Sequence, residues 1–337
     1  MTTVGIAGAS GYTGAELLRL CAQHPDLEVA WATGETQAGT PVGELYPSLA
    51  AAFGGMAYER YDPALADGLD LVFLALPHGE SQAIVPDLRK RVGKIVDLAA
   101  DFRLRDASLY PTWYGEEHRA PQLLAEFAFG IPELFREAVR AADLVAAPGC
   151  YVTAAALALA PLVRGGAIEP AGVIVDAASG VSGAGRQTKP AYHFPAVTED
   201  FTAYGLLTHR HTPEIEQATG AQVLFTPHLA PMARGILATC YARPAAGWSG
   251  DPLELLQTFY ADEPFVLVTD ASPSTKATRG SNCAHLTARL DERTGWVVVL
   301  CALDNLVKGA SGQAVQCANL VLGLDEGTGL STVGLYP

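Results

Sequence analysis

The sequence is poor in positive charge and has no long apolar run. Lysine and arginine number 22 against 36 aspartates and glutamates, which gives a net charge of −14 at pH 7. Because proteins bind nucleic acid by neutralising phosphates with lysine and arginine, this balance argues against a nucleic-acid partner. No uninterrupted apolar stretch approaches about 18 residues, so we expect no membrane span.

The six cysteines include no Cys-x-x-Cys pair and no spacing typical of a zinc site. Most lie in apolar runs, which suits a reducing compartment better than a disulfide framework. The N-terminus leads directly into an apolar run, without the basic segment and cleavage site of a secretory signal. We therefore expect a cytoplasmic protein, and its 337 residues with 49% hydrophobic content are enough for two globular domains.

Glycine is concentrated near the N-terminus, in the turn Gly-Ala-Ser-Gly-Tyr-Thr-Gly at residues 8–14. An apolar run, 4–7, precedes the turn, and a helix-forming run, 15–21, follows it. This order opens a dinucleotide-binding fold, in which glycines let the backbone approach a pyrophosphate at the helix N-terminus. The spacing meets the general G-x-G-x-x-G fingerprint only in part. A glycine-rich turn without a ligand is the alternative.

The segment after the next expected strand, 27–32, bears on the choice of dinucleotide. Glu35 can hold ribose hydroxyls, as an acidic residue does in NAD sites. Thr33, Thr36 and Gln37 can instead donate hydrogen bonds to a 2′-phosphate. Both NAD and NADP remain open on these residues.

Two further apolar runs, 71–76 and 94–99, are typical of parallel strands buried on both faces. Each is followed by polar residues, and the carboxyl ends of such strands line the ligand crevice of open α/β sheets. We expect His78 to be a turn residue beside the cofactor. Arg103 can bind an anionic substrate group bidentately. The alternative for Arg103 is an ion pair with Asp101 or Asp106.

Cys150 stands between a short apolar strand and a helix-forming run. The strand, 144–146, runs into a Pro-Gly turn, and the helix is expected from Thr153 to Val163. Unpaired N–H groups and the helix dipole stabilise a thiolate at such a helix start. We therefore interpret Cys150 as a covalent nucleophile, and the alternative is a buried structural cysteine.

The expected strand 173–176 leads into Ser-Gly-Val-Ser-Gly-Ala-Gly-Arg at residues 179–186. Three glycines, two hydroxyls and an arginine indicate a loop whose backbone N–H groups bind an anion. A flexible hairpin turn is the alternative. The irregular segment that continues to Thr208 is long for a compact domain, and such loops tend to be functional.

A second chemical cluster is His-Arg-His-Thr-Pro-Glu at residues 209–214. We expect Thr212 to cap a helix with Pro213 at its first position, so that His211 lies just before the helix. Glu214 can orient a histidine, and a neutral histidine is the usual acid/base group near pH 7. A metal site and purely structural histidines are the alternatives.

The rest of the chain is dominated by expected strands, with one helix over 252–260. The strands are 223–225, 236–241, 265–268, 284–290 and 296–303. This pattern predicts an α+β second domain on a mostly antiparallel sheet. Arg234 precedes one strand and is a further candidate anchor for the substrate. A C-terminal helix reaching Leu322 is expected to return to the first domain, which gives a Rossmann-type domain of 1–149 with 309–337 and a catalytic and dimerisation domain of 150–308.

Together these features suit one kind of chemistry. A thiolate beside a hydride carrier can take an acyl group as a thioester, which then receives a hydride and leaves as an aldehyde. Anion-binding loops fit an acyl phosphate, whose phosphate departs when sulfur attacks.

The segments 8–14, 73–79, 101–104, 148–151, 179–186, 209–215 and 304–309 together resemble the N-acetyl-gamma-glutamyl-phosphate reductase family, relatives of aspartate-semialdehyde dehydrogenase. The resemblance covers essentially the whole chain. It implies NADPH as the hydride donor, Cys150 as the acyl acceptor and a histidine of the 209–211 cluster as acid/base. We favour His211 over His209 because Glu214 follows it by about one helical turn.

The site residues expected on this reading fall into three groups. The catalytic group is Cys150, His211, His209 and Glu214. The cofactor group is Gly8, Ser10, Gly11, Tyr12, Thr13, Gly14, Thr33, Thr36, Pro77, Ser182, Gly183, Asn305 and Gly309. The substrate group is Arg103, Ser179, Arg186 and Arg234, and no metal is expected.

Three other readings stay open. A family variant acts on an aminoadipyl phosphate attached to an acidic carrier protein, which the net charge of −14 disfavours. A non-catalytic dinucleotide-binding regulator would not need Cys150. A Cys-His acyl hydrolase would not need the glycine turn. The partner expected here is a small acyl phosphate, and the second domain is expected to support a homo-oligomer, a dimer or a tetramer.

Overall fold

The computed structural model describes residues 1–337, which divide into two compact units. The first comprises Met1–Pro148 and Ala310–Leu330, and the second comprises Gly149–Gly309 and Ser331–Pro337. The last residues, Ser331–Pro337, thus group with the second unit, whereas the sequence placed them with the dinucleotide-binding part.

The first unit is built on a six-stranded parallel sheet in the order β2-β1-β3-β4-β6-β5. The chain moves from β1 outward to β2, then crosses to β3 on the other side of β1. This reversal creates a switch point between β1 and β3, where ligands bind in such sheets. The strands are β1 Thr2–Ala7, β2 Leu27–Ala32, β3 Leu71–Leu74, β4 Lys94–Asp97, β5 Phe127–Phe129 and β6 Leu144–Ala146.

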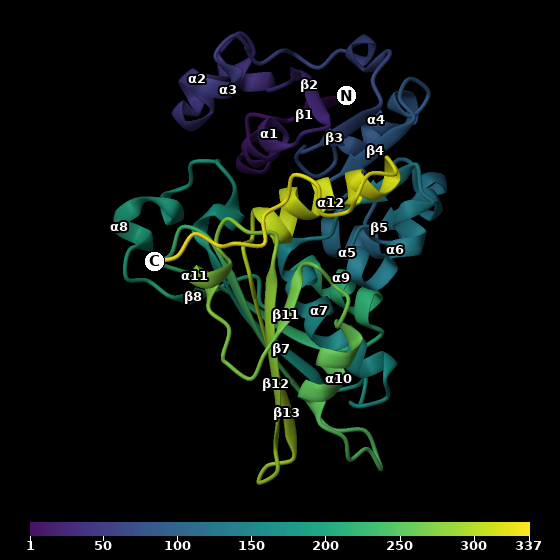
Figure 1. Cartoon of the computed structure of the whole chain (residues 1–337), viewed down its shortest axis with the longest axis vertical. Helices are drawn as coiled ribbons and strands as arrows, with labels where there is room; N and C mark the ends of the chain where they lie inside the picture. The colour runs from purple at the N-terminus through teal and green to yellow at the C-terminus, as the bar shows by residue number, and fades with distance from the viewer. The chain divides into compact units, whose positions relative to one another are not determined.

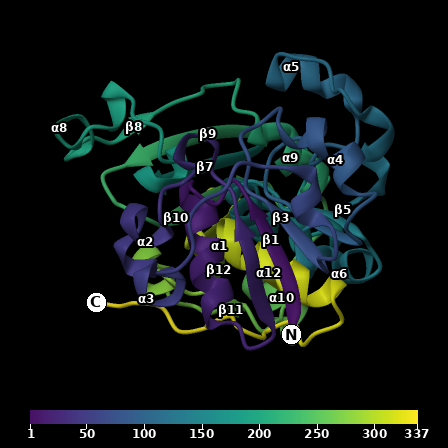
Figure 2. The same cartoon turned by 90° about the horizontal axis from the view of Figure 1, so that it is seen from above.

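Helices cover both faces of this sheet (Figure 2). Along β3, Leu71 and Phe73 join one hydrophobic core, and Val72 and Leu74 join another. The first core receives α1 and α12, and the second receives α4. The helices of this unit are α1 Tyr12–Gln23, α2 Val42–Leu45, α3 Ala50–Phe53, α4 Ser81–Leu88, α5 Tyr110–Tyr114, α6 Pro132–Arg140 and α12 Gly312–Val321.

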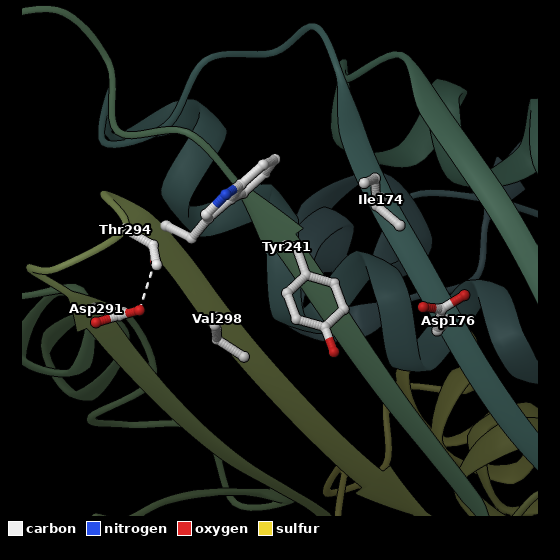
Figure 3. A pocket seen from close by; sticks show the side chains of 7 residues that line it. Ile174, Asp176, Tyr241, Asp291, Thr294 and Val298 are labelled. Carbon is white, nitrogen blue, oxygen red and sulfur yellow. Dashed lines mark hydrogen bonds between the residues drawn. The ribbon is translucent and has the colours of Figure 1, made fainter.

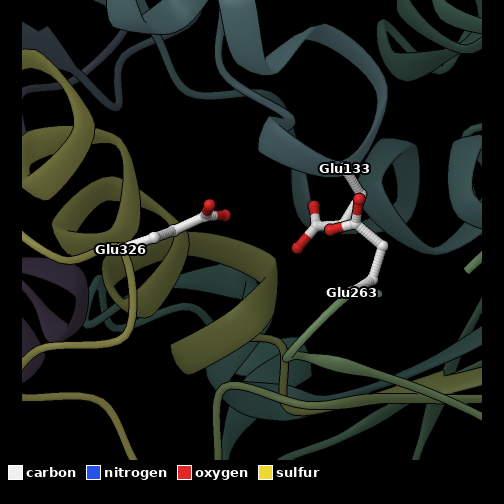
Figure 4. Close-up of side chains that lie close together, drawn as sticks. All are labelled: Glu133, Glu263 and Glu326. Carbon is white, nitrogen blue, oxygen red and sulfur yellow. The ribbon is translucent and has the colours of Figure 1, made fainter. Parts of the chain in front are cut away.

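The late helix α12 packs against α1, α6 and β4 of the first unit (Figure 1). Gln316 on α12 donates hydrogen bonds to the carboxylates of Glu133 at 2.9 Å and Glu326 at 2.7 Å. Arg136 on α6 forms an ion pair with Glu326 at 2.8 Å. Figure 4 shows the Glu133 and Glu326 carboxylates that these bonds link.

The second unit contains a seven-stranded mixed sheet in the order β11-β12-β13-β10-β7-β9-β8. Its pairings are antiparallel except for β11 with β12 and β7 with β9. The strands are β7 Val173–Gly180, β8 Thr202–Ala203, β9 Val223–Ala230, β10 Ile236–Ala242, β11 Val266–Val268, β12 Ala284–Asp291 and β13 Trp296–Leu303. The predicted combination of a Rossmann-type sheet with a mostly antiparallel second sheet is confirmed.

Helices pack on one face of the second sheet only. Buried residues alternate with half-buried ones along β7, β10 and β13, so the face away from the helices is left partly open. Figure 1 shows α7 and α10 on one side of these strands. The helices are α7 Cys150–Arg164, α8 Phe194–Val197, α9 His211–Thr219, α10 Pro252–Phe259 and α11 Thr275–Thr278.

Two buried carboxyls lie at the carboxyl edge of the first sheet. Asp97 and Asp101 each place an oxygen 2.9 Å from the hydroxyl of Ser81, and all three side chains are fully buried. A hydroxyl has one proton to donate, so one of the two carboxyls must carry a proton of its own. Asp101 also accepts hydrogen bonds from the N–H groups of Gly79 and Gln82, which marks it as the ionised partner.

The proton therefore resides on Asp97. Burial, and then the negative charge of Asp101, raise the pKa of Asp97 to about 7, against the opposing effects of the Ala99 N–H, Ser81 and Arg103. Burial also acts to raise the pKa of Asp101. Hydrogen bonds from His78, Gly79 and Gln82 outweigh that effect and lower the Asp101 pKa to about 2.

These shifts predict a pH dependence of stability. Because the pKa of Asp97 is raised on folding, its contribution is complete below about pH 4 and is lost as pH rises through about 7. Asp101 acts in the opposite sense, and its contribution is lost as pH falls from about 4 toward 2. Asp97→Asn, whose amide replaces the acid proton, should remove most of the decline between pH 4 and 7, on the order of a few kcal/mol. Urea unfolding at a series of pH values measures this. An unchanged decline in the variant would contradict the assignment.

Candidate active site

The glycine turn after β1 is compressed between the ends of two strands. Gly8 has φ +81°, and a Cβ there would overlap the carbonyl of Ala75. A Cβ on Gly14 would overlap the backbone of Ala9. Helix α1 begins at Tyr12, earlier than expected, and its N-cap residue Gly11 provides no side-chain cap. Its first N–H groups are therefore available to an anion, and the cradle fits a dinucleotide pyrophosphate.

The side chains after β2 have contacts that differ in part from those expected. Thr33 is buried, and its hydroxyl accepts a hydrogen bond from the Gly8 N–H at 3.2 Å, so it supports the turn from within the fold. Glu35 accepts a hydrogen bond from the Tyr61 N–H at 3.0 Å. Thr36 is exposed in the 3-10 turn Glu35–Gln37. Of Thr33 and Thr36, the two threonines of this segment that were expected to contact the cofactor, only Thr36 has an accessible side chain.

Arg103 makes backbone contacts that the sequence did not lead us to expect. Its side chain is buried and donates hydrogen bonds to the carbonyls of Ala147 at 2.8 Å and Leu98 at 2.6 Å. These carbonyls directly follow β6 and β4. The guanidinium therefore joins two strand ends. Of the two carboxylates given as alternative ion-pair partners, Asp106 accepts a hydrogen bond from the Ser108 N–H, and Asp101 accepts hydrogen bonds from the Gly79 and Gln82 N–H groups. We assign Arg103 to holding this edge of the sheet and withdraw it from the substrate group.

In the second unit, Cys150 is the first residue of α7, a helix of 15 residues that begins earlier than the sequence predicted. Gly149 precedes it and has no side chain with which to cap the helix. The other five cysteines are buried, whereas Cys150 is partly exposed. Burial raises the pKa of Cys21 and Cys240 to about 12, which keeps those thiols protonated. Accessibility and a helix start thus coincide at Cys150.

His211 and Glu214, both on α9, contact the residue before Cys150. A Cβ on Gly149 would overlap the imidazole of His211, so the ring lies directly against this glycine. The carboxylate of Glu214 is buried and accepts a hydrogen bond from the Gly149 N–H at 3.0 Å. Helix α9 begins at His211 itself, so the expected capping role of Thr212 is wrong.

His209 differs from His211 in its surroundings. Its Nδ1 accepts a hydrogen bond from the His211 N–H at 3.1 Å, and its ring packs among Tyr151, Tyr204 and Phe225. Burial, and then the charge of Arg210, lower the pKa of His209 to about 4. It is therefore neutral at pH 7, and its Nδ1 is occupied in holding the start of α9.

Three residues of the expected anion loop, Ser179, Ser182 and Gly183, lie close to Asn305, which was expected to contact the cofactor. A Cβ on Gly183 would fall 2.9 Å from the hydroxyl of Ser179. The side chain of Asn305 donates to the hydroxyl of Ser182 at 3.0 Å and accepts from the Gly235 N–H at 2.7 Å. Ser179 is the penultimate residue of β7 rather than part of a loop.

Arg186 and Arg234, the two arginines of this unit that were expected to bind the substrate, are placed differently. Arg186 follows Gly185, which has φ +77°, and its buried Nε has no hydrogen-bond partner. Arg234 donates two hydrogen bonds to one carboxylate oxygen of Asp304, at 3.1 and 3.2 Å. Asp304 is fully buried and also accepts from the Gly280 N–H at 2.7 Å. Sequence reasoning missed Asp304, because nothing in its local pattern marks a buried acid.

Gly309, expected to contact the cofactor, lies against Cys150. It belongs to a π-helical turn, Val307–Ser311, that precedes α12. A Cβ on Gly309 would fall 2.8 Å from the Cβ of Cys150. Such turns are frequent at functional sites. A larger residue at this position would displace the thiol.

A separate hollow of about 450 Å³ lies on the open face of the second sheet (Figure 3). None of the expected site residues lines it. Its walls are side chains of neighbouring strands and of one hairpin turn: Ile174, Asp176, Tyr241, Asp291, Thr294, Trp296 and Val298.

Comparisons with known proteins identify the family of both units. The family model described as "Semialdehyde dehydrogenase, NAD binding domain" matches residues 3–142, and that described as "Semialdehyde dehydrogenase, dimerisation domain" matches 150–305. These matches support a nicotinamide dinucleotide as cofactor and a homo-oligomeric state. No helix is both long enough and apolar enough to cross a membrane.

Relatives match over the full chain. The N-acetyl-gamma-glutamyl-phosphate reductase of Desulforudis audaxviator is 50% identical and covers 100% of both chains, and that of Symbiobacterium thermophilum is 50% identical over 99% of both. Among solved structures, aspartate semialdehyde dehydrogenase II from Vibrio cholerae shares the fold, with a TM-score of 0.69 at 16% identity, over 96% of this chain and 98% of that one. The chain therefore belongs to the N-acetyl-gamma-glutamyl-phosphate reductase family, within the semialdehyde dehydrogenases.

Proposed function

We propose that this chain reduces N-acetyl-gamma-glutamyl phosphate to N-acetylglutamate 5-semialdehyde, with release of phosphate, as a step of arginine biosynthesis. The observation that carries the proposal is the partly exposed Cys150 at the start of α7, with the His211 ring against the preceding residue. The names of the relatives that match over the full chain support this choice of substrate. We propose that the protein acts in the cytoplasm.

NADPH is the proposed hydride donor. Gly8 and Gly14 let the turn pack tightly against Ala75 and Ala9, and the uncapped start of α1 that follows offers N–H groups to a pyrophosphate. Thr36 is exposed after β2, while the Glu35 carboxylate is engaged by the Tyr61 N–H. This arrangement supports a 2′-phosphate at that position. When bound, the cofactor supplies the hydride that reduces the thioester.

In the first half of the proposed reaction, the Cys150 thiolate attacks the acyl carbon. A carbon–sulfur bond forms, the carbon–oxygen bond to phosphate breaks, and phosphate leaves with the electron pair. The start of α7 stabilises the thiolate before the attack. Ser179, Arg186 and Arg234 are proposed to hold the anionic groups of the substrate. Arg186 offers a buried N–H without a partner for this purpose.

In the second half of the proposed reaction, His211 donates one proton and later takes it back. Hydride addition converts the thioester into a tetrahedral adduct with negative charge on oxygen. His211 lends a proton to that oxygen and takes it back as the carbon–sulfur bond breaks, so that Cys150 leaves as a thiolate. His209 is proposed to position His211 through its Nδ1, and Glu214 to hold the Gly149 backbone.

We also infer that the open face of the second sheet forms the homo-oligomer contact. The match of this unit to a dimerisation domain supports the inference. Large apolar side chains on its strands remain about half exposed, among them Leu224 at 50% and Leu267 at 48%. Covering such surface with a second copy removes it from water.

The proposed activity predicts phosphate-dependent reduction of NADP by N-acetylglutamate semialdehyde, measured in the reverse direction by absorbance at 340 nm. The rate with NAD should be lower, because nothing then occupies the 2′-phosphate position.

Cys150→Ser should lose about 10³-fold or more in rate yet still bind NADPH. Cys283→Ser is the matched control, since a hydroxyl there can keep the hydrogen bond to the Thr332 carbonyl. No reduction by the wild type would refute the proposal. NADPH binding with full turnover in Cys150→Ser would refute the mechanism.

The two histidines should separate on substitution. His211→Asn removes the proton donor and should lower kcat by about 10²-fold or more. His209→Asn can keep an oxygen acceptor for the His211 N–H and should lower kcat by less than about tenfold. Steady-state kinetics on both variants, with thermal unfolding to check their folds, make the comparison. A larger loss of kcat in His209→Asn than in His211→Asn would reverse the assignment.

A further inference from the structure

The loop Pro77–Gly79 lies at the switch point of the first sheet and is not used by the mechanism above. It follows β3, and Ala75, just before it, donates its N–H to the carbonyl of Ala7 at 2.8 Å. The glycine turn packs against the same segment, because a Cβ on Gly8 would overlap Ala75. Any ligand held by the glycine turn therefore has this loop as its neighbour.

His78 is the one ionisable side chain of this loop, and it is tightly held. Its Nδ1 lies 2.6 Å from a carboxylate oxygen of Asp101, and its Nε2 lies 3.4 Å from Glu116. The imidazole packs against the ring of Tyr114, with centroids 4.4 Å apart. The side chain remains 16% exposed, and because both ring nitrogens are buried, the exposed edge of the ring is made of carbon. A ring fixed on three sides and still reachable by a ligand is suited to binding.

Asp101 is the centre of this arrangement. Besides His78, its carboxylate accepts hydrogen bonds from the N–H groups of Gly79 at 2.8 Å and Gln82 at 2.9 Å, and lies within hydrogen-bond distance of Ser81. Its carbonyl oxygen accepts from Tyr110 and contacts the His118 ring nitrogen. A fully buried carboxylate is costly unless it is paired and hydrogen-bonded. Here its partners are concentrated on the loop after β3 and the first turn of α4.

The neighbouring acid makes this arrangement possible. Asp97 carries a proton and donates it to Ser81, which leaves the Ser81 proton for Asp101. Two buried carboxyls can then share one hydroxyl without two negative charges facing each other. Asp97 is thus the protonated aspartate of this site and Asp101 the ionised one.

We propose that Asp101 is a positioning residue for the dinucleotide: it fixes the loop Pro77–Gly79 so that the exposed edge of His78 contacts the bound cofactor. The proposal rests on the proposed function, because it takes the dinucleotide as the ligand of the glycine turn. His78 is then a binding residue, and Asp101 acts through it. Neither residue takes part in the thioester chemistry.

Asp97→Asn and Asp101→Asn form a matched pair for the test. The measurement is the Kd for NADPH, from its fluorescence on titration into the full chain without substrate, with thermal unfolding measured alongside. Asp97→Asn reproduces the protonated acid and should change the Kd by less than about twofold. Asp101→Asn replaces a carboxylate acceptor with an amide that repels the Gly79 or Gln82 N–H, and should raise the Kd by about tenfold or more.

His78→Phe provides a second route if Asp101→Asn does not fold. It keeps a ring against Tyr114 but lacks both imidazole nitrogens. We expect it to raise the Kd and the KM for NADPH by about tenfold, with kcat at saturating NADPH changed much less. A purely structural role would instead lower the unfolding temperature without this split.

The outcomes distinguish a failure of this inference from a failure of the proposed function. Wild-type NADPH affinity in Asp101→Asn or in His78→Phe would overturn the inference while leaving the proposed function intact. An equal loss of affinity in Asp97→Asn would also overturn it. A wild-type chain that binds neither NADPH nor NADH would refute the proposed function and this inference with it.

Discussion

The close approach of α9 to Gly149 is the contact on which the second unit's chemistry depends. The imidazole of His211 occupies the space where a side chain of residue 149 would lie, and the buried Glu214 carboxylate accepts the Gly149 N–H. On the next residue, the π-helical turn brings Gly309 against Cys150. Two glycines thus let a histidine and a backbone turn pack around one thiol. A methyl group at either position would displace the residues that we assign to catalysis.

Buried carboxylates organise the surroundings in both units. In the first unit, Asp101 gathers the loop after β3 and the start of α4, and Asp97 holds the proton that lets it do so. In the second unit, Asp304 accepts from Arg234 and from the Gly280 N–H. Each carboxylate is fully buried and has several donors, which offsets the cost of removing its charge from water. Hydrogen bonds to these buried carboxylates therefore fix the conformation of loops, which non-directional hydrophobic contacts alone do not fix.

The strands were largely predictable because their apolar runs are continuous or alternating. Strands β2, β6 and β13 have the predicted bounds. The nature of each domain followed from the same patterns. Short strand β5 was not anticipated, since a three-residue run, Phe127–Phe129, has no period to detect. The starts of α1, α7 and α9 lie earlier than predicted, because each helix begins on residues that are not strong helix formers, such as Tyr12, Cys150 and His211.

Side-chain partners were harder to predict than elements. Local sequence patterns, a helix start or a glycine spacing, mark Cys150, His211 and the glycine turn, and the structure contains these features. Arg103 and Thr33 were assigned to ligands because they follow strands, yet both bond to backbone groups distant in sequence. The sequence offers no measure of such long-range partners. Thr212 shows the same limit at short range, since its capping pattern is overridden by the packing of His211 on Gly149.

The most direct test of the central claim is to look for the thioester itself. The full chain is mixed with N-acetyl-gamma-glutamyl phosphate in the absence of NADPH, quenched in acid and examined by peptide mass spectrometry. The account predicts one acyl group, on Cys150, that disappears when NADPH is added before the quench. Acylation of another residue, or no acylation in a preparation that turns over with NADPH, would contradict it.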